Sequence, residues 1–141
     1  DIELFYQHLS ALKKGEDVNI PIYSYKLHNR INRTKLVVSC NFLITEGLFI
    51  FHEEKLRKCF DLKIYLDIDY KTRFDRRIKR DVIERGRDRD EVENRFKSTI
   101  DKMHHKYVDK TKEYADVILK SNDNFEIIEQ ALNSFLNELE K

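Results

Sequence analysis

The chain has 141 residues, of which 40% are hydrophobic and 38% are charged, and this is enough for a single domain over residues 1–141. Lys plus Arg number 27 and Asp plus Glu number 26, so the net charge is +1. That balance argues against a nucleic-acid partner, and no apolar run reaches the ~18 residues of a membrane span. Cys40 and Cys59 suggest no disulfide framework, which is typical of a reducing cytosol, and we expect a cytoplasmic protein.

Apolar spacing and turn residues predict alternating helices and strands. Asp1 is a suitable cap for the first helix, Gly15 is well placed to end it, and Pro21 interrupts the first strand, which favours an edge position. In chain order we expect a helix over 2–14, a strand over 18–22, a loop or loose hairpin over 23–33, strands over 36–38 and 42–44, a short helix over 53–60, a strand over 62–66, helices over 70–85 and 88–113, a strand over 115–119 and a helix over 125–139.

The strands near residues 42, 62 and 115 are separated by helices, a pattern typical of a parallel α/β sheet with flanking helices. The run 42–44 is apolar without alternation, which predicts a strand covered on both faces. Ligands of such sheets bind at the carboxyl ends of the strands. Those ends carry Glu46, the segment 67–69 and the turn 121–123, so we expect the functional residues there.

A carboxylate at the end of an apolar strand, such as Glu46, can hold a hydrated Mg²⁺ or orient a nucleophile. The alternative is that Glu46 only caps the following helix. His104 and His105 are adjacent, and adjacent side chains on a helix diverge by about 100°, so we reject a shared metal ion there.

The segment 71–89 carries nine basic and four acidic side chains, a local net charge of +5. Four of its arginines share one helical face by their spacing: Arg73, Arg76, Arg77 and Arg80. Guanidinium groups bind phosphate oxygens through two parallel hydrogen bonds, so this face is a candidate phosphate site. The alternative is a solvated charged face, in which these arginines pair with Asp81 and Glu84.

The polar segment after the first strand contains Tyr23, Tyr25 and His28. Two aromatic faces and an imidazole can stack on a planar base and hydrogen-bond to it, although ordinary loop packing explains the same residues.

Five segments, in the same order, resemble the uridine–cytidine kinase pattern of the uridine kinase/phosphoribulokinase family of P-loop kinases. They are I-P-I-Y-S-Y at 20–25 with His28 and Arg30 behind it, T-E-G-L at 45–48, D-I-D at 67–69 with its following arginines, E-R-G-R-D at 84–88, and T-K-E-Y-A-D-V-I at 111–118. The segment at 84–88 is the most specific of these.

The resemblance implies a partial P-loop kinase fold, a parallel sheet with flanking helices, and a helical lid over about 80–110. It implies transfer of the γ-phosphoryl of ATP or GTP to the 5′-hydroxyl of uridine or cytidine with Mg²⁺, and a homo-oligomer, a tetramer in many members. The resemblance starts after the Walker A loop of the family, so we expect the carboxyl-terminal two-thirds of a nucleoside kinase, inactive by itself. The alternative is a non-catalytic kinase-like subunit or a nucleotide-binding module.

The resemblance, with the arguments above, also assigns site residues. Contacts to the nucleoside or its phosphates fall on Tyr23, Tyr25, His28, Leu48, Arg77, Arg87 and Arg95. Catalytic roles fall on Arg80, Arg85 and Glu46, with Glu46 as the Mg²⁺ ligand. At Arg95 this sequence departs from the family, which has a glutamine there.

Overall fold

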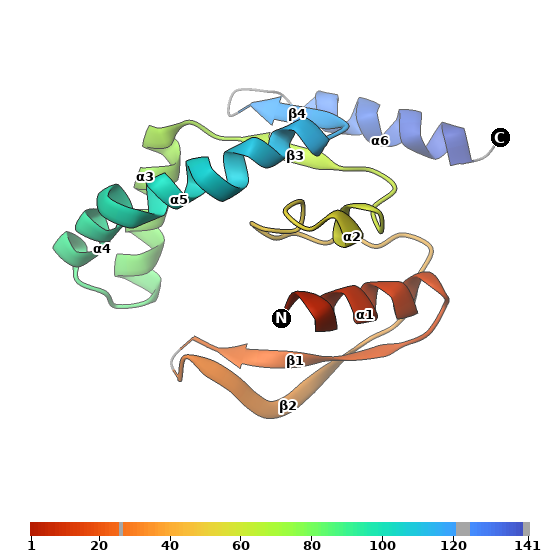
Figure 1. Cartoon of the computed structure of the whole chain (residues 1–141), viewed down its shortest axis with the longest axis horizontal. Coiled ribbons are helices and arrows are strands. Elements are labelled where there is room, and N and C mark those ends of the chain that lie inside the picture. The colour runs from red at the N-terminus through yellow and green to blue at the C-terminus, as the bar shows by residue number, and fades with distance from the viewer. Residues whose placement is uncertain (26, 121–124, 140–141) are drawn as a thin grey trace. The chain divides into compact units, whose positions relative to one another are not determined.

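The computed structural model describes residues 1–25, 27–120 and 125–139 (Figure 1). The chain divides into two compact units, Asp1–Gly47 and Leu48–Lys141. The single domain expected from the length stays a prediction. Of the helices in the described part of the chain, none is both long and apolar enough to span a membrane.

The first unit opens with helix α1 (Ile2–Lys13), as predicted. Asp1 begins it, since its Oδ1 accepts a hydrogen bond from the Leu4 backbone N–H at 3.0 Å. Leu9 is the buried residue of α1. Gly15 follows the end of the helix with φ +85°, a left-handed conformation that glycine adopts at little cost.

Strands β1 (Val18–Ser24) and β2 (Asn29–Val37) form an antiparallel hairpin. For residues 23–33 the sequence left a loop or a loose hairpin open, and the structure has the hairpin, because both strands extend into this segment. Strand β2 is exposed along most of its length. A strand that buries neither face needs no apolar alternation, so the sequence predicts a strand only near its end, over 36–38.

The predicted buried strand over 42–44 is wrong. Residues 42–47 are irregular, and all three apolar side chains of the run are exposed, Ile44 by 77%. A strand requires a neighbour for its backbone hydrogen bonds. The strands of the described residues pair only as β1 with β2 and β3 with β4, so this run has no partner strand there.

The second unit contains the parallel pair that the sequence predicts. Strand β3 (Ile64–Asp67) lies beside β4 (Val117–Lys120), one to two residues further along the chain than expected. Asp116 fixes the start of this pair, because its Oδ2 accepts a hydrogen bond from the Lys63 backbone N–H at 2.7 Å. The short helix α2 (Glu54–Arg57) is half as long as predicted.

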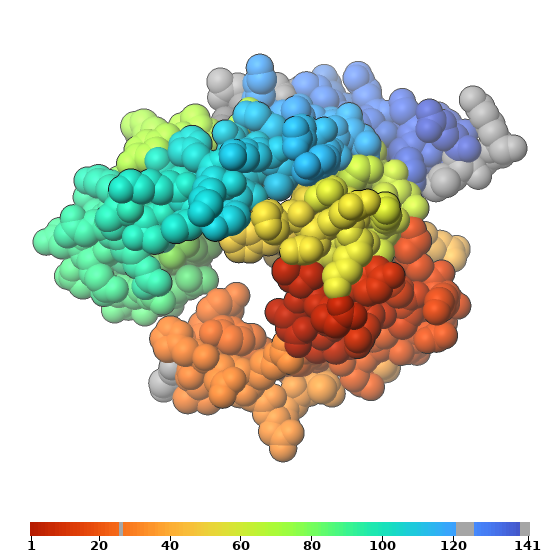
Figure 2. Space-filling view, viewed as in Figure 1, coloured from red at the N-terminus to blue at the C-terminus, as the bar shows by residue number. Residues whose placement is uncertain are grey.

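A small core of Phe51, Tyr65 and Val108 holds β3 between the segment around α2 and the long helical segment that follows. The rings of His52 and Tyr107 extend this contact in an edge-to-face arrangement, with centroids 5.7 Å apart. The space-filling view shows the surface around residues 50–58 directly against that of residues 104–114 (Figure 2).

The predicted helix over 70–85 is confirmed as α3 (Tyr70–Lys79), which continues as a π-helical turn over Arg80–Glu84 and stops before Gly86. Gly86 has φ +62°. Asp69 caps the start of α3 through a 2.9 Å hydrogen bond to its Oδ1 from the Thr72 backbone N–H.

The predicted helix over 88–113 is a continuous helical segment that changes its winding. It consists of α4 (Arg89–Arg95), a π turn over Phe96–Ile100, α5 (Asp101–Met103), a second π turn over His104–Val108 and a 3₁₀ turn over Asp109–Tyr114.

The last helix, α6 (Phe125–Leu139), has the predicted extent, and its apolar side chains Ile128, Leu132 and Phe135 are half-buried. The turn 121–123, where a functional residue was expected, lies outside the described residues.

Helices α3 and α4 form a hairpin around Gly86 that has its own apolar core. Ile78 of α3 and Val92 of α4 are buried, and so is Phe96 just after α4. The Phe96 ring meets the rings of Tyr70 and Phe74 edge-to-face, with centroids 5.5 and 5.2 Å apart. This core fixes the geometry of the arginine-rich segment.

Candidate functional site

Three of the arginines assigned from the sequence converge on one carboxylate, that of Asp81, so the pairing with Asp81 that the alternative interpretation of this face required is present. Arg77 Nε lies 2.7 Å from Asp81 Oδ2, and Arg80 Nε and Arg85 Nη1 lie 3.1 and 3.2 Å from Oδ1. We call these four residues the Asp81 cluster. Asp81 itself is fully buried, while the three arginine side chains remain partly exposed. The formal charge of the cluster is +2, presented at the surface, and this suits an anionic ligand.

The charges within the cluster shift two pKa values. Burial by itself would raise the pKa of Asp81, but the hydrogen bond from Arg80 and the positive charges of Arg77, Arg80 and Arg85 outweigh it, so the pKa lies below its usual value. Burial lowers the pKa of Arg77, helped by the charges of Arg80 and Arg85 and opposed by Asp81. Asp81 is therefore ionised at neutral pH.

The turn after the cluster brings in Arg87. Its backbone N–H donates to the Asp81 carbonyl oxygen at 3.1 Å, which closes the turn around Gly86. Asp88 then caps α4 through a 2.9 Å hydrogen bond to its Oδ1 from the Glu91 backbone N–H. Arg95 lies exposed on α4 and takes part in none of the contacts of the Asp81 cluster.

The first unit carries the aromatic candidates at the tip of its hairpin. Tyr23 lies near the end of β1 beside Tyr25, and their rings pack edge-to-face with centroids 5.3 Å apart, both exposed. His28 precedes β2 with φ +51°, an uncommon conformation for a residue with a side chain. Ser24 supports the turn by accepting a hydrogen bond at its Oγ from the Leu27 backbone N–H at 3.2 Å.

Glu46 lies in the irregular segment 42–47 that replaces the predicted strand, Leu48 lies in the turn that begins the second unit, and both are exposed. Among the described residues, no group of three or more His, Cys, Asp or Glu could hold a metal ion. Mg²⁺, however, usually takes only one or two carboxylates and completes its shell with water and substrate phosphates. An exposed carboxylate such as Glu46 fits that role as one ligand of the set, and the assignment stays a prediction.

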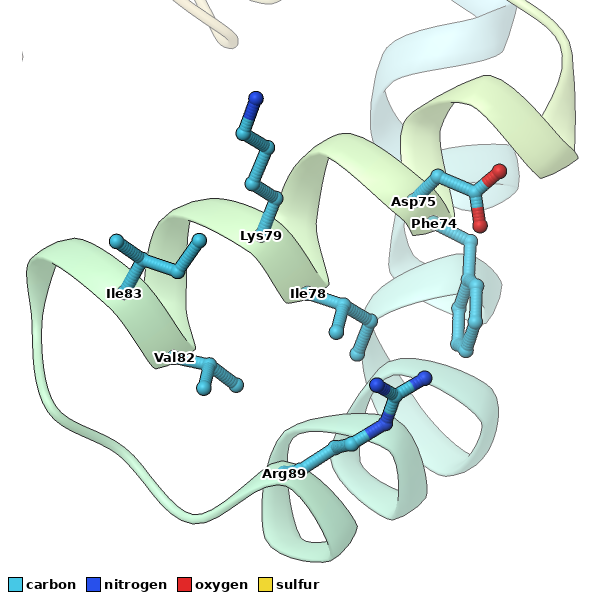
Figure 3. A pocket seen from close by; sticks show the side chains of 7 residues that line it. All are labelled: Phe74, Asp75, Ile78, Lys79, Val82, Ile83 and Arg89. Atoms are coloured by element: carbon cyan, nitrogen blue, oxygen red, sulfur yellow. The ribbon is translucent and has the colours of Figure 1, made fainter.

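A groove of about 300 Å³ lies between α3, with the π turn that follows it, and the start of α4 (Figure 3). Four apolar and three charged side chains line it: Phe74, Ile78, Val82 and Ile83, and Asp75, Lys79 and Arg89. None of the residues in the Asp81 cluster lines it. The groove and the cluster are therefore separate features of the hairpin.

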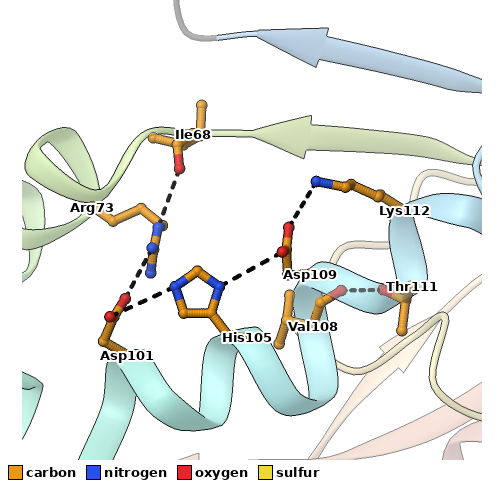
Figure 4. Close-up of polar contacts among 8 residues, drawn as sticks. All are labelled: Ile68, Arg73, Asp101, His105, Val108, Asp109, Thr111 and Lys112. Atoms are coloured by element: carbon orange, nitrogen blue, oxygen red, sulfur yellow. Dashed lines mark hydrogen bonds and ion pairs between the residues drawn. The ribbon is translucent and has the colours of Figure 1, made fainter. Parts of the chain in front are cut away.

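A second polar network, which the sequence did not reveal, ties α3 to the long helical segment (Figure 4). Arg73 donates from Nε to the Ile68 carbonyl oxygen at 3.1 Å and pairs through Nη2 with Asp101 at 3.0 Å. Further along the helix, His105 lies between Asp101 and Asp109, 3.7 and 3.6 Å from their carboxylate oxygens. Spacing placed Arg73 on the candidate phosphate face. Its contacts are structural instead, because its guanidinium group already bonds the Ile68 carbonyl oxygen and Asp101.

The profile of the phosphoribulokinase / uridine kinase family matches residues 1–127. A uridine kinase of Borrelia garinii subsp. bavariensis is 38% identical over 141 residues, which cover the whole of this chain and 68% of that protein. A uridine kinase of Clostridium tetani is 40% identical over 119 residues, 84% of this chain and 57% of that protein.

A uridine kinase of Streptococcus equi subsp. zooepidemicus is 34% identical over an alignment that covers 99% of this chain and 69% of that protein. The chain belongs to the phosphoribulokinase / uridine kinase family. Its α/β structure, with a small parallel sheet flanked by helices, is consistent with part of a P-loop kinase fold.

Proposed function

We propose that this chain supplies the acceptor-binding hairpin and the arginine-bearing lid of a nucleoside kinase. The reaction transfers the γ-phosphoryl of ATP or GTP to the 5′-hydroxyl of uridine or cytidine, which yields the nucleoside 5′-monophosphate and a nucleoside diphosphate. The observation that carries the proposal is the Asp81 cluster, in which Arg77, Arg80 and Arg85 are gathered around one carboxylate in a member of this family. Phosphoryl transfer needs such positioned positive charge more than covalent chemistry.

The β1–β2 hairpin favours an acceptor that contains a base. Tyr23 and Tyr25 expose aromatic faces beside His28, which can hydrogen-bond to the edge of a pyrimidine. A sugar phosphate without a base, the other acceptor that the family name implies, has no planar group to stack there. Leu48, Arg87 and Arg95 complete the proposed nucleoside and phosphate contacts.

Mg²⁺ in such a reaction neutralises charge on the donor phosphates. Glu46 is the residue of this chain proposed to hold it. The three glycines of the sequence do not form a glycine-rich phosphate loop, so we expect the 141 residues alone to show no turnover.

The test uses the full product of the gene that encodes this chain, which we call the full gene product. It is incubated with ATP and Mg²⁺ and, separately, with uridine, cytidine, adenosine and ribulose 5-phosphate, and monophosphate or bisphosphate products are separated by chromatography. We expect uridine and cytidine to be phosphorylated and the other two to remain unchanged. Phosphorylation of ribulose 5-phosphate, or binding of uridine without any turnover, would contradict the proposal.

The contribution of the β1–β2 hairpin to uridine binding is tested with His28→Gly. Glycine replaces alanine as the test residue, because alanine would be strained at φ +51° whereas glycine is not. Loss of the base-edge hydrogen bond should weaken uridine binding by about 1–3 kcal/mol. Binding of ATP should change far less. Asn32→Ala, an exposed position of β2, is the matched control, and equal losses for both ligands in His28→Gly would remove His28 from the base site.

A further inference from the structure

Asp81 differs from every other charged side chain in the described part of the chain, because it alone is buried there. A buried carboxylate is costly unless cations and hydrogen-bond donors compensate it. Asp81 has three such cations, from Arg77, Arg80 and Arg85. A sequence needs no buried charge merely to pack a helix, so the placement of this carboxylate calls for an explanation in terms of what it holds.

The nitrogen atoms that form the ion pairs with Asp81 indicate which part of each arginine is left for a ligand. Arg77 and Arg80 both approach Asp81 with Nε, the inner nitrogen of the guanidinium group. The two terminal Nη groups of each therefore stay outside the contact with Asp81. Those terminal groups are the ones that form two parallel hydrogen bonds to a phosphate.

The side chains of the cluster have to be held in place against their own charge. An arginine has a long flexible stem, and three guanidinium groups in one cluster repel each other. The α3–α4 core of Ile78 and Phe96 fixes the backbone on either side of Gly86. A fixed negative charge at their centre offsets the repulsion and selects one arrangement.

We propose that Asp81 is a positioning residue, which grips Arg77 and Arg80 by Nε and Arg85 by Nη1 so that the terminal groups of the first two face the transferring phosphoryl. The inference rests on the proposed kinase function and adds to it the residue that organises the arginines. Asp81 touches neither substrate nor nucleotide. It acts before the reaction, because arginines already held in position need no reorganisation in the transition state.

The experiment compares Asp81→Asn with wild type in the full gene product, by steady-state kinetics with uridine and by NMR of the arginine Nε–Hε signals. Asparagine has the same shape without the charge. We expect kcat to fall about 10²-fold, as for a catalytic group displaced by about 1 Å, while KM for uridine changes less than about twofold. The Nε–Hε signal of Arg80, whose Nε donates to Asp81 Oδ1 at 3.1 Å, should lose its protection from exchange with water.

Two further variants make the result specific. Asp75→Asn is the matched control, because Asp75 lies on the same helix but is exposed and pairs only with Lys71 at 2.7 Å among the ion pairs of the described residues; its kcat should equal that of wild type. Asp81→Glu keeps the negative charge, and we expect it to recover part of kcat and of the signal protection. It also provides the test if thermal unfolding shows that Asp81→Asn does not fold.

The outcomes separate this inference from the proposed function. A wild-type protein that phosphorylates neither uridine nor cytidine overturns the proposed function, whatever the variants do. An active wild type with unchanged kcat in Asp81→Asn overturns the positioning role, and so does an Asp81→Glu protein that folds but recovers neither kcat nor signal protection. Retained protection of the Arg80 signal in Asp81→Asn overturns the assignment of Asp81 as its anchor.

Discussion

Phe96 is the residue on which the α3–α4 hairpin should depend most, and Phe96→Ala tests that dependence. Its side chain is only 2% exposed, and its ring contacts those of Tyr70 and Phe74. Truncating a buried phenylalanine costs about 3–5 kcal/mol. Two edge-to-face partners are lost as well, and each such pair contributes about 0.5–1.5 kcal/mol beyond simple burial. We therefore expect a loss of about 4–5 kcal/mol, in the upper part of the range for such substitutions.

The assay is urea unfolding of the full gene product, followed by circular dichroism, with hydrogen exchange of the α3 and α4 amides as the local readout. A loss of this size is a large fraction of the roughly 5–15 kcal/mol that stabilises a typical domain. The matched control is Phe49→Ala, in the same unit but 48% exposed, which should cost below about 1 kcal/mol.

A loss below about 1 kcal/mol in Phe96→Ala would refute the reasoning, because a packed aromatic core cannot lose its central ring so cheaply. An equal effect of both substitutions would refute it too. Faster exchange confined to α3 and α4 would instead locate the core of the hairpin where the ring contacts place it.

Three further predictions concern the turn and the cluster beside it. Gly86→Ala should cost about 1–2 kcal/mol in urea unfolding, from backbone strain alone, because φ is +62° and no atom lies within 4 Å of an added Cβ; Gly86→Asn should cost less. Arg87→Lys should lower kcat for uridine more than Asp88→Asn, since an ammonium cannot make a two-point contact with phosphate and Asp88 is a helix cap. The lowered pKa of Asp81 means that its contribution to stability is full above the pKa of the unfolded chain, near 3.8, and is lost as the pH falls through the lower folded value. The difference in unfolding free energy between wild type and Asp81→Asn should therefore shrink below about pH 4.

The sequence predicts those features of the fold that depend on neighbouring residues, such as helix caps and the extent of a helix. Asp1 was predicted to cap the first helix and does so; the structure adds Asp69 and Asp88 as caps of the same kind for α3 and α4. Apolar spacing correctly predicted one helix over 70–85, which ends before Gly86. The run 42–44 failed because a strand is defined by its neighbours, and apolar composition alone does not supply one.

The organisation of the candidate site was less readable, because it depends on burial and on distant partners. In the sequence Asp81 is one of four acidic residues among nine basic ones between 71 and 89, and only its burial distinguishes it. Arg73 fits the face of Arg77 and Arg80 by spacing, yet it pairs with Asp101, 28 positions away. No local sequence pattern predicts an ion-pair partner that lies 28 positions away.

The geometry of the hairpin changes how a lid in this segment can move. A glycine between two helices suits a hinge, but the Phe96 ring packs against Tyr70 and Phe74 across Gly86, and the Arg87 N–H closes the turn onto Asp81. Opening the hairpin at Gly86 would expose that apolar core and break the closure at the same time. Any closure over phosphates that keeps this core intact must therefore carry α3 and α4 together, and the arginines on both sides of Gly86 move as one group rather than toward each other.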